Sequence, residues 1–285
     1  MHKDTRWARA LITMQDEEGK WGNFHSLSSG SGLPVTTEQA LRRLEILGYT
    51  AEDDCIRKAL SYMHDCLSGK KQLPDRREKL HDWDIFTSMI LSAWIRRFTK
   101  EDPLANAAAE NWAKVITAAF VSGGFDRQAY EAAFHDALFL KPKGGRLTDP
   151  CHFYLVSLMR DMLDPQIEAA FVRYILDHPQ GIYYIWEKPL RTLPDFCSLA
   201  ASRYLGAVEL LAGYEQGREE LRFAADWLLS HRRPDGSWDM GPGAKGGVYF
   251  PLSDSWRRAE DRIADCTGRI DRMLTKILSQ NVEKD

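Results

Sequence analysis

The sequence has no long apolar run. No stretch approaches the roughly 20 consecutive apolar residues that a membrane-spanning helix requires. Residues 1–4 lead into an amphipathic helical pattern and not into the apolar core of a signal peptide. We therefore expect no membrane span, and we expect a cytoplasmic protein.

A strong excess of charge of either sign is also missing. The 285 residues include 38 lysines and arginines against 41 aspartates and glutamates, which gives a formal net charge of −3. Because the basic residues are spread among acidic ones, no basic face is indicated, and we expect no nucleic-acid partner. Only five cysteines occur, without close paired spacing, which is typical of reduced thiols and not of a disulfide framework.

The alternating apolar and polar pattern of β-strands is the third absence. Apolar residues instead recur at helical spacing, glycines end the runs, and Asp-Pro pairs begin them. The sequence thus predicts an all-α chain, with helices over 4–14, 36–47, 51–67, 82–98, 104–121, 126–138, 149–163, 165–176, 195–214, 218–230 and 255–278.

These helices alternate between amphipathic runs and more apolar ones, which is the pattern expected of an outer layer and a doubly buried inner layer. Five to six such hairpins, arranged as an incomplete barrel, form an α/α toroid. We expect residues 1–285 to form that single domain, with a frayed tail at 281–285.

Two copies of one short pattern stand out, at residues 15–22 and, more weakly, at residues 232–238. In each copy an apolar helical run ends, a glycine follows, and a tryptophan comes two residues later. Gly19 and Gly236 can take the positive φ of a sharp helix exit. The indole can pack back over the helix end while its N–H finds a carbonyl. We interpret each copy as a structural clamp without a catalytic role.

This clamp pattern resembles the QW repeat of the squalene–hopene cyclase and protein prenyltransferase superfamily: glutamine, three residues, glycine, one residue, tryptophan. The first copy fits fully from Gln15, whereas the second carries Arg232 in place of the glutamine. The resemblance covers the helical pattern of most of the chain. It implies an α/α toroid whose inner helices begin at a central apolar pocket, where a small hydrophobic ligand of the isoprenoid type is bound or transformed.

Residues 82–85, with the sequence DWDI, resemble a shortened form of the Asp-x-Asp-Asp motif with which class II terpene cyclases protonate an alkene. Asp84 matches the middle acid, but Ile85 stands beside it where the motif has a further acid. Acids at helix starts are also ordinary N-caps, so capping is the alternative role. The catalytic candidates are Asp84, Asp82, His81 and Asp265.

Residues 149–152, with the sequence DPCH, resemble the Asp-x-Cys pair that ligates zinc in protein prenyltransferases, where a later histidine completes the site. Carboxylate, thiolate and imidazole suit a tetrahedral zinc ion with an open position for a substrate thiol. Because no later histidine is obvious in the sequence, His152 or His135 has to serve. We assign Asp149, Cys151 and His152 to the metal, and zinc is the one cofactor that the resemblance implies.

Three cysteines lie beside acids at expected starts of inner helices: Cys151, Cys197 and Cys266. Three thiols at the mouth of one central pocket could hold a metal or supply a nucleophile, since helix N-termini lower thiol pKa values. The alternative is that each cysteine is a small buried side chain.

Aromatic and basic side chains complete the candidate site. Aromatic faces accommodate an isoprenoid chain or stabilise a carbocation, and an arginine can bind a diphosphate. Core packing and an ordinary solvated surface are the alternatives. The substrate-binding candidates are Trp83, Tyr154, Tyr184, Trp186, Phe196 and Arg191.

Two further functions stay open at this stage. One is a carbohydrate-active lyase or hydrolase of the toroid type, with acid and base among Asp82, Asp84, Asp136 and Asp265. The other is a module without catalysis that binds a hydrophobic ligand or another protein. The sequence leaves turnover, substrate identity and oligomeric state undecided.

Overall fold

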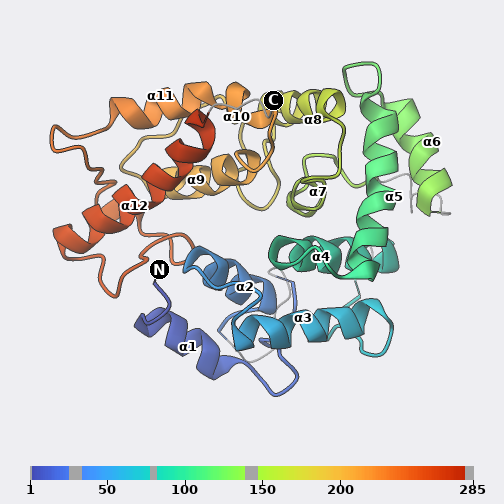
Figure 1. Cartoon of the computed structure of the whole chain (residues 1–285), viewed down its shortest axis with the longest axis horizontal. Coiled ribbons are helices and arrows are strands. Elements are labelled where there is room, and N and C mark those ends of the chain that lie inside the picture. The colour runs from blue at the N-terminus through green and yellow to red at the C-terminus, as the bar shows by residue number, and fades with distance from the viewer. Residues whose placement is uncertain (1, 26–33, 78–81, 139–146, 280–285) are drawn as a thin grey trace, which may run out of the picture. The chain divides into compact units, whose positions relative to one another are not determined.

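The structure is a computed structural model that describes residues 2–25, 34–77, 82–138 and 147–279 (Figure 1). Within these ranges the chain forms twelve α-helices and one short 3-10 helix, with no β-strand beyond two isolated bridges. This confirms the all-α prediction. His81 and the tail at 281–285 lie outside the described residues. No helix in the described part has both the length and the apolar character needed to cross a membrane.

Residue contacts divide the chain into two compact units. The first consists of Met1–Ala119, Asp126–Pro150 and Tyr154–Met162, and the second of Phe120–Phe125, Cys151–Phe153 and Leu163–Asp285.

Helices of the first unit follow the local signals of the sequence. Thr36 and Gln39 form a capping box at the start of α2, and the Asp82 carboxylate caps α4. Helix α3 packs on α4, whose middle is buried on most sides, and α1 packs on α2 (Figure 1). The helices are α1 (Arg6–Met14), α2 (Thr37–Ile46), α3 (Asp54–Leu67), α4 (Trp83–Phe98), α5 (Pro103–Phe120), α6 (Arg127–Leu138) and α7 (Phe153–Leu158).

In the second unit, α11 packs on α12, and α10 packs on both α8 and α12. The 3-10 helix η2 lies against α9. The elements are α8 (Pro165–Asp177), α9 (Leu199–Leu211), α10 (Gly217–Glu220), α11 (Arg222–Ser230), η2 (Pro242–Ala244) and α12 (Ala259–Leu278).

Several helices begin later than predicted, and two of them have a clear local cause. Helix α7 begins only at Phe153, because the backbone at Cys151 and His152 pairs with Tyr183 and is not helical. Helix α9 begins at Leu199, because Ser198 is its N-cap, with the hydroxyl accepting from the Ala201 N–H at 3.1 Å.

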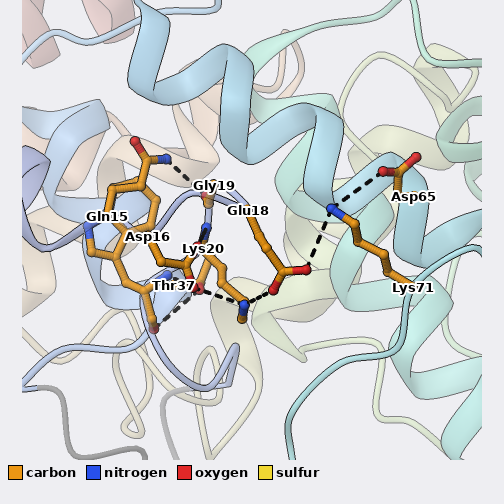
Figure 2. Close-up of polar contacts among 9 residues, drawn as sticks. Gln15, Asp16, Glu18, Gly19, Lys20, Thr37, Asp65 and Lys71 are labelled. Atoms are coloured by element: carbon orange, nitrogen blue, oxygen red, sulfur yellow. Dashed lines mark hydrogen bonds and ion pairs between the residues drawn. The ribbon is translucent and has the colours of Figure 1, made fainter.

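The first clamp, residues 15–22, ends α1 and binds it to α3 (Figure 2). The Gln15 side-chain amide donates to the Gly19 carbonyl at 2.9 Å and to the Cys55 carbonyl at 2.8 Å. Gly19 has φ +96°, and a Cβ there would collide with the carbonyl of Lys58 on α3. The clamp therefore needs glycine for its conformation and for the close approach of α3.

Trp21 joins the first clamp to α1 and α2. Its side chain is fully buried, and its indole N–H donates to the Leu11 carbonyl at 2.7 Å. Its backbone N–H donates to the Thr37 hydroxyl at 2.9 Å, at the first residue of α2. The indole therefore finds the helix-end carbonyl that the spacing predicts.

The second clamp, residues 232–238, repeats these contacts in the second unit. The Trp238 indole is fully buried and donates to the Leu228 carbonyl at 2.7 Å, and its backbone N–H donates to the Thr267 hydroxyl at 3.0 Å. The guanidinium Nε of Arg232 donates to the Gly236 carbonyl at 2.9 Å, which is the contact that Gln15 makes with Gly19. Arginine thus replaces the glutamine of the pattern in function as well as in position.

Candidate metal centre

Asp149, Cys151 and His178 form a group suited to holding a metal ion. Each offers one ligand atom, and the three atoms lie within 4.8 Å of one another. Asp149 and Cys151 are the two residues that the Asp-x-Cys pattern assigns to a metal. The histidine that the structure brings to them is His178, whereas the sequence assignment used His152.

Local backbone structure places these three side chains. Asp149 is exposed, and only Pro150 separates it from Cys151, which is 2% exposed. The Cys151 carbonyl accepts a hydrogen bond from the Tyr183 N–H at 3.2 Å. His178 follows the last residue of α8 in an extended conformation, and its carbonyl accepts from the Gly181 N–H at 3.0 Å. The chain therefore turns back after α8 and returns to Cys151.

The ring of His178 is held by its surroundings. Its Nδ1 accepts a long hydrogen bond of 3.3 Å from the Gln180 N–H, and its ring centroid lies 5.4 Å from that of Tyr174. A metal on Nε2 requires the proton on Nδ1, so metal binding at Nε2 has to open the contact with Gln180.

The donor set fits zinc. Thiolate, imidazole and carboxylate are all zinc ligands, and three protein ligands leave the fourth tetrahedral position open. A calcium or magnesium site draws on oxygen ligands instead, so Cys151 and His178 together favour zinc. Within the group Asp149 is exposed, His178 is partly exposed and Cys151 is buried.

His152 is placed differently from the assigned role. Its side chain is 6% exposed, and its ring centroid lies 5.3 Å from Tyr183 and 5.1 Å from Tyr184. His135, the other histidine considered for the metal, lies exposed on α6 beside Asp136, with 3.4 Å between Nδ1 and the carboxylate. Neither belongs to the metal-type group found among the described residues.

None of the proposed catalytic acids that the structure describes belongs to this group. Asp82 accepts from the backbone N–H groups of Asp84 and Ile85, at 3.1 and 3.2 Å, as an N-cap does. Asp84 is exposed and pairs with exposed Arg77 at 3.3 Å. Asp265 is 1% exposed, and it accepts from the Leu252 N–H at 2.7 Å and from the Ser253 N–H and hydroxyl at 3.0 Å.

Two aromatic candidates in the second unit, Trp186 and Phe196, are connected through the rings of Tyr204 and Trp227. The Trp186 ring lies 5.2 Å from Tyr204, which lies 5.4 Å from Trp227, and Phe196 lies 5.6 Å from Trp227. The exposed guanidinium of Arg191 pairs with Asp177 at 2.6 Å.

In the first unit, Trp83 packs on Phe86 with 6.2 Å between ring centroids, and the Tyr154 hydroxyl donates to buried Glu38 at 2.9 Å.

Two other cysteines differ from Cys151 in their surroundings. Burial raises the pKa of the Cys266 thiol to about 12. Cys197 is exposed, and desolvation together with Asp195 raises its pKa. Both shifts favour the protonated thiol, which is a poor metal ligand and nucleophile. Of the three cysteines considered together, only Cys151 lies in a metal-type group within the described residues.

Comparisons of the chain with protein-family models, with curated proteins and with solved structures give no match. The functional assignment therefore depends on the residues and their geometry.

Proposed function

We propose that this chain is a zinc-binding protein of the prenyltransferase and terpenoid cyclase type, an α/α toroid that binds or transforms an isoprenoid. The observation that carries the proposal is the grouping of Asp149, Cys151 and His178, with their ligand atoms within 4.8 Å of one another. The two clamps and the all-helical chain add support, because both accompany such a site in the resembled superfamily.

The chain's own residues divide the task at this site. Cys151 supplies a thiolate from a buried position, and His178 supplies an imidazole from the end of α8. Asp149, which is exposed, supplies the carboxylate on the accessible side. When bound, zinc in a site of this kind supplies Lewis acidity and lowers the pKa of a coordinated thiol. An apolar ligand beside the metal then requires apolar walls, for which Tyr184 and Trp186 are the candidates nearest in sequence to His178.

Metal analysis tests the proposal. Purified protein, dialysed against buffer with trace zinc, is compared with Cys151→Ser and His178→Ala. The matched controls are Cys197→Ser and His135→Ala, which change the same residue types at exposed positions outside the group. We expect stoichiometric zinc in the wild type and in both controls, and its loss in the two site variants. Zinc that persists in both site variants, or its absence from the wild type, would contradict the metal assignment.

The proposed binding of an isoprenoid is tested by a separate measurement. A fluorescent isoprenoid diphosphate is titrated into the zinc-loaded protein, with an alkyl diphosphate of equal length but without double bonds as the competitor. We expect saturable binding with preference for the isoprenoid. Binding of neither probe would leave a zinc protein without this ligand, and would contradict the isoprenoid assignment alone.

A further inference from the structure

A tight loop at residues 181–186, here called the tyrosine finger, leads away from the end of α8 and back. Ile182 and Trp186 exchange both backbone hydrogen bonds, each of 2.9 Å, which closes the finger at its base. Gly181 has φ +59°, and a Cβ there would collide with the carbonyl oxygens of Trp186 and Lys188. The base of the finger is therefore fixed by backbone contacts that admit only glycine at its start.

At the tip, the finger holds an unusual backbone conformation. Tyr184 has φ +75°, one of two non-glycine residues with positive φ in the described part of the chain, the other being Asp161. Such conformations persist only where the surrounding structure imposes them, and they cluster at functional sites. The rings of Tyr183 and Tyr184 lie 4.1 Å apart at the tip, and Tyr183 is 44% exposed.

The finger is joined directly to a residue of the metal-type group. The Tyr183 N–H donates to the Cys151 carbonyl at 3.2 Å, and Tyr183 forms a parallel β-bridge with His152. The centroids of the two tyrosine rings lie 5.3 and 5.1 Å from that of the His152 ring. These contacts fix the backbone on both sides of the Cys151 carbonyl, and they hold the neighbouring histidine ring among aromatic groups.

We infer that the tyrosine finger is a positioning element for the metal centre, which orients Cys151 through the backbone contact from Tyr183. The positive φ of Tyr184 turns the chain back at the tip, so that the finger closes on Trp186 while the Tyr183 N–H stays directed at the Cys151 carbonyl. This inference rests on the proposed zinc site and adds to it a second group of residues, which does not touch the metal. Outer contacts of this kind orient ligands and tune metal affinity.

Three substitutions at one position separate the backbone from the ring. Tyr184→Gly and Tyr184→Asn remove the ring but accept positive φ, whereas Tyr184→Val removes the ring and resists it. Zinc affinity is measured by competition with a chromophoric chelator. The cobalt-substituted protein gives a second readout, because its thiolate charge-transfer and d–d bands report the geometry at the sulfur ligand.

We expect Tyr184→Val to weaken zinc binding by about 10–100-fold, the usual effect of losing an outer contact, and to shift the cobalt bands. Tyr184→Gly and Tyr184→Asn should keep the zinc affinity and the cobalt bands close to those of the wild type. The control is Leu228→Ala, a core change in α11 of the same unit, which lowers the melting temperature without moving the cobalt bands. It separates positioning from general loss of stability.

Three results would overturn the inference, and they are distinguishable. If all three Tyr184 variants bind zinc like the wild type, the finger has no positioning role while the zinc site stands. If Gly and Asn weaken binding as much as Val, the ring and not the backbone is responsible. If the wild type shows no zinc binding that depends on Cys151, the proposed function fails and the inference fails with it.

Discussion

The two clamps reach the same geometry with different residues. In both, an indole N–H donates to a carbonyl on the preceding helix at 2.7 Å, and the backbone N–H of the tryptophan donates to a threonine hydroxyl. In both, a long side chain donates to the glycine carbonyl at 2.9 Å, from Gln15 in one and Arg232 in the other. The turn therefore requires a nitrogen donor of sufficient reach at this position, and not glutamine in particular.

The clamps differ in what surrounds them. Gln15 also donates to Cys55 at the start of α3, so the first clamp joins two helices besides the turn itself. Lys20 pairs with Asp16 at 2.9 Å, and Lys71 pairs with Glu18 at 3.8 Å and Asp65 at 3.7 Å, which extends the first clamp into an ion-pair network (Figure 2). Arg232 instead lies over the Trp238 ring at 5.2 Å. The first clamp thus also contacts other helices, whereas the contact of Arg232 with Trp238 stays within the second clamp.

The largest effect is expected from removing either indole. Trp21→Ala and Trp238→Ala each delete a fully buried side chain together with its hydrogen bond, and each should lower the free energy of unfolding by about 3–5 kcal/mol. Urea unfolding followed by circular dichroism measures the loss. A loss below about 1 kcal/mol at either position would show that its indole is not a structural anchor.

Replacing the exit glycine should destabilise the two clamps to different extents. Alanine at either position is strained at positive φ by about 1–2 kcal/mol. At Gly19 the added Cβ also meets the Lys58 carbonyl, whereas at Gly236 it meets the flexible end of Arg232 at 3.2 Å. We therefore expect Gly19→Ala to cost about 3 kcal/mol and Gly236→Ala about 1 kcal/mol in the same unfolding measurement. Equal losses would contradict the close approach of α3 to the first clamp.

Removing the donor side chain should cost the first clamp one hydrogen bond more than the second. Gln15→Ala removes two bonds and should cost about 1–3 kcal/mol, while Arg232→Ala removes one and should cost about 0.5–1.5 kcal/mol. Arg232→Gln should be nearly neutral in thermal melts, because glutamine makes the corresponding contact in the first clamp. A loss from Arg232→Gln as large as that from Arg232→Ala would show that the charge or the contact with Trp238 matters instead.

A smaller, pH-dependent effect is expected beside the second clamp. Asp239 follows Trp238 and pairs with Arg262 through two contacts, of 2.6 and 2.8 Å, and this bond lowers the pKa of the Asp239 carboxyl. A lowered pKa in the folded state contributes stability above the unfolded pKa of about 3.9, and this stability is lost as the pH falls through the folded value.

The Asp239→Asn variant tests this expectation. It should be less stable than the wild type at neutral pH by about 1 kcal/mol, and the two melting temperatures should converge as the pH falls below about 4. An unchanged difference between the two proteins across that range would show that the Asp239 carboxylate is not the titrating group. Asp16→Asn provides the corresponding comparison in the first clamp.

Local signals in the sequence predicted most of the helices. Capping residues such as Thr36 and Asp82, and the exit glycines, act within a few residues of their own position, so the helices they bound were found nearly in place. The exceptions are instructive. The helix expected from residue 149 starts late because the backbone at Cys151 pairs with Tyr183, a partner distant in the sequence.

The same long-range pairing explains why the candidate site was only partly predicted. Asp149 and Cys151 are recognisable from their spacing, but His178 comes to them through the turn after α8 and the tyrosine finger. No spacing rule connects a helix C-terminus to a cysteine in this way. The functional equivalence of Arg232 and Gln15 was also invisible in the sequence, because it depends on a shared carbonyl acceptor and not on residue type.

The most direct test of the central claim is X-ray absorption at the zinc edge of the metal-loaded protein. The proposed site predicts a single sulfur neighbour at about 2.3 Å with nitrogen and oxygen neighbours at about 2.0–2.2 Å, and the sulfur neighbour should disappear in Cys151→Ser. A zinc ion with only nitrogen and oxygen neighbours, or with several sulfur neighbours, would contradict a centre built from Asp149, Cys151 and His178.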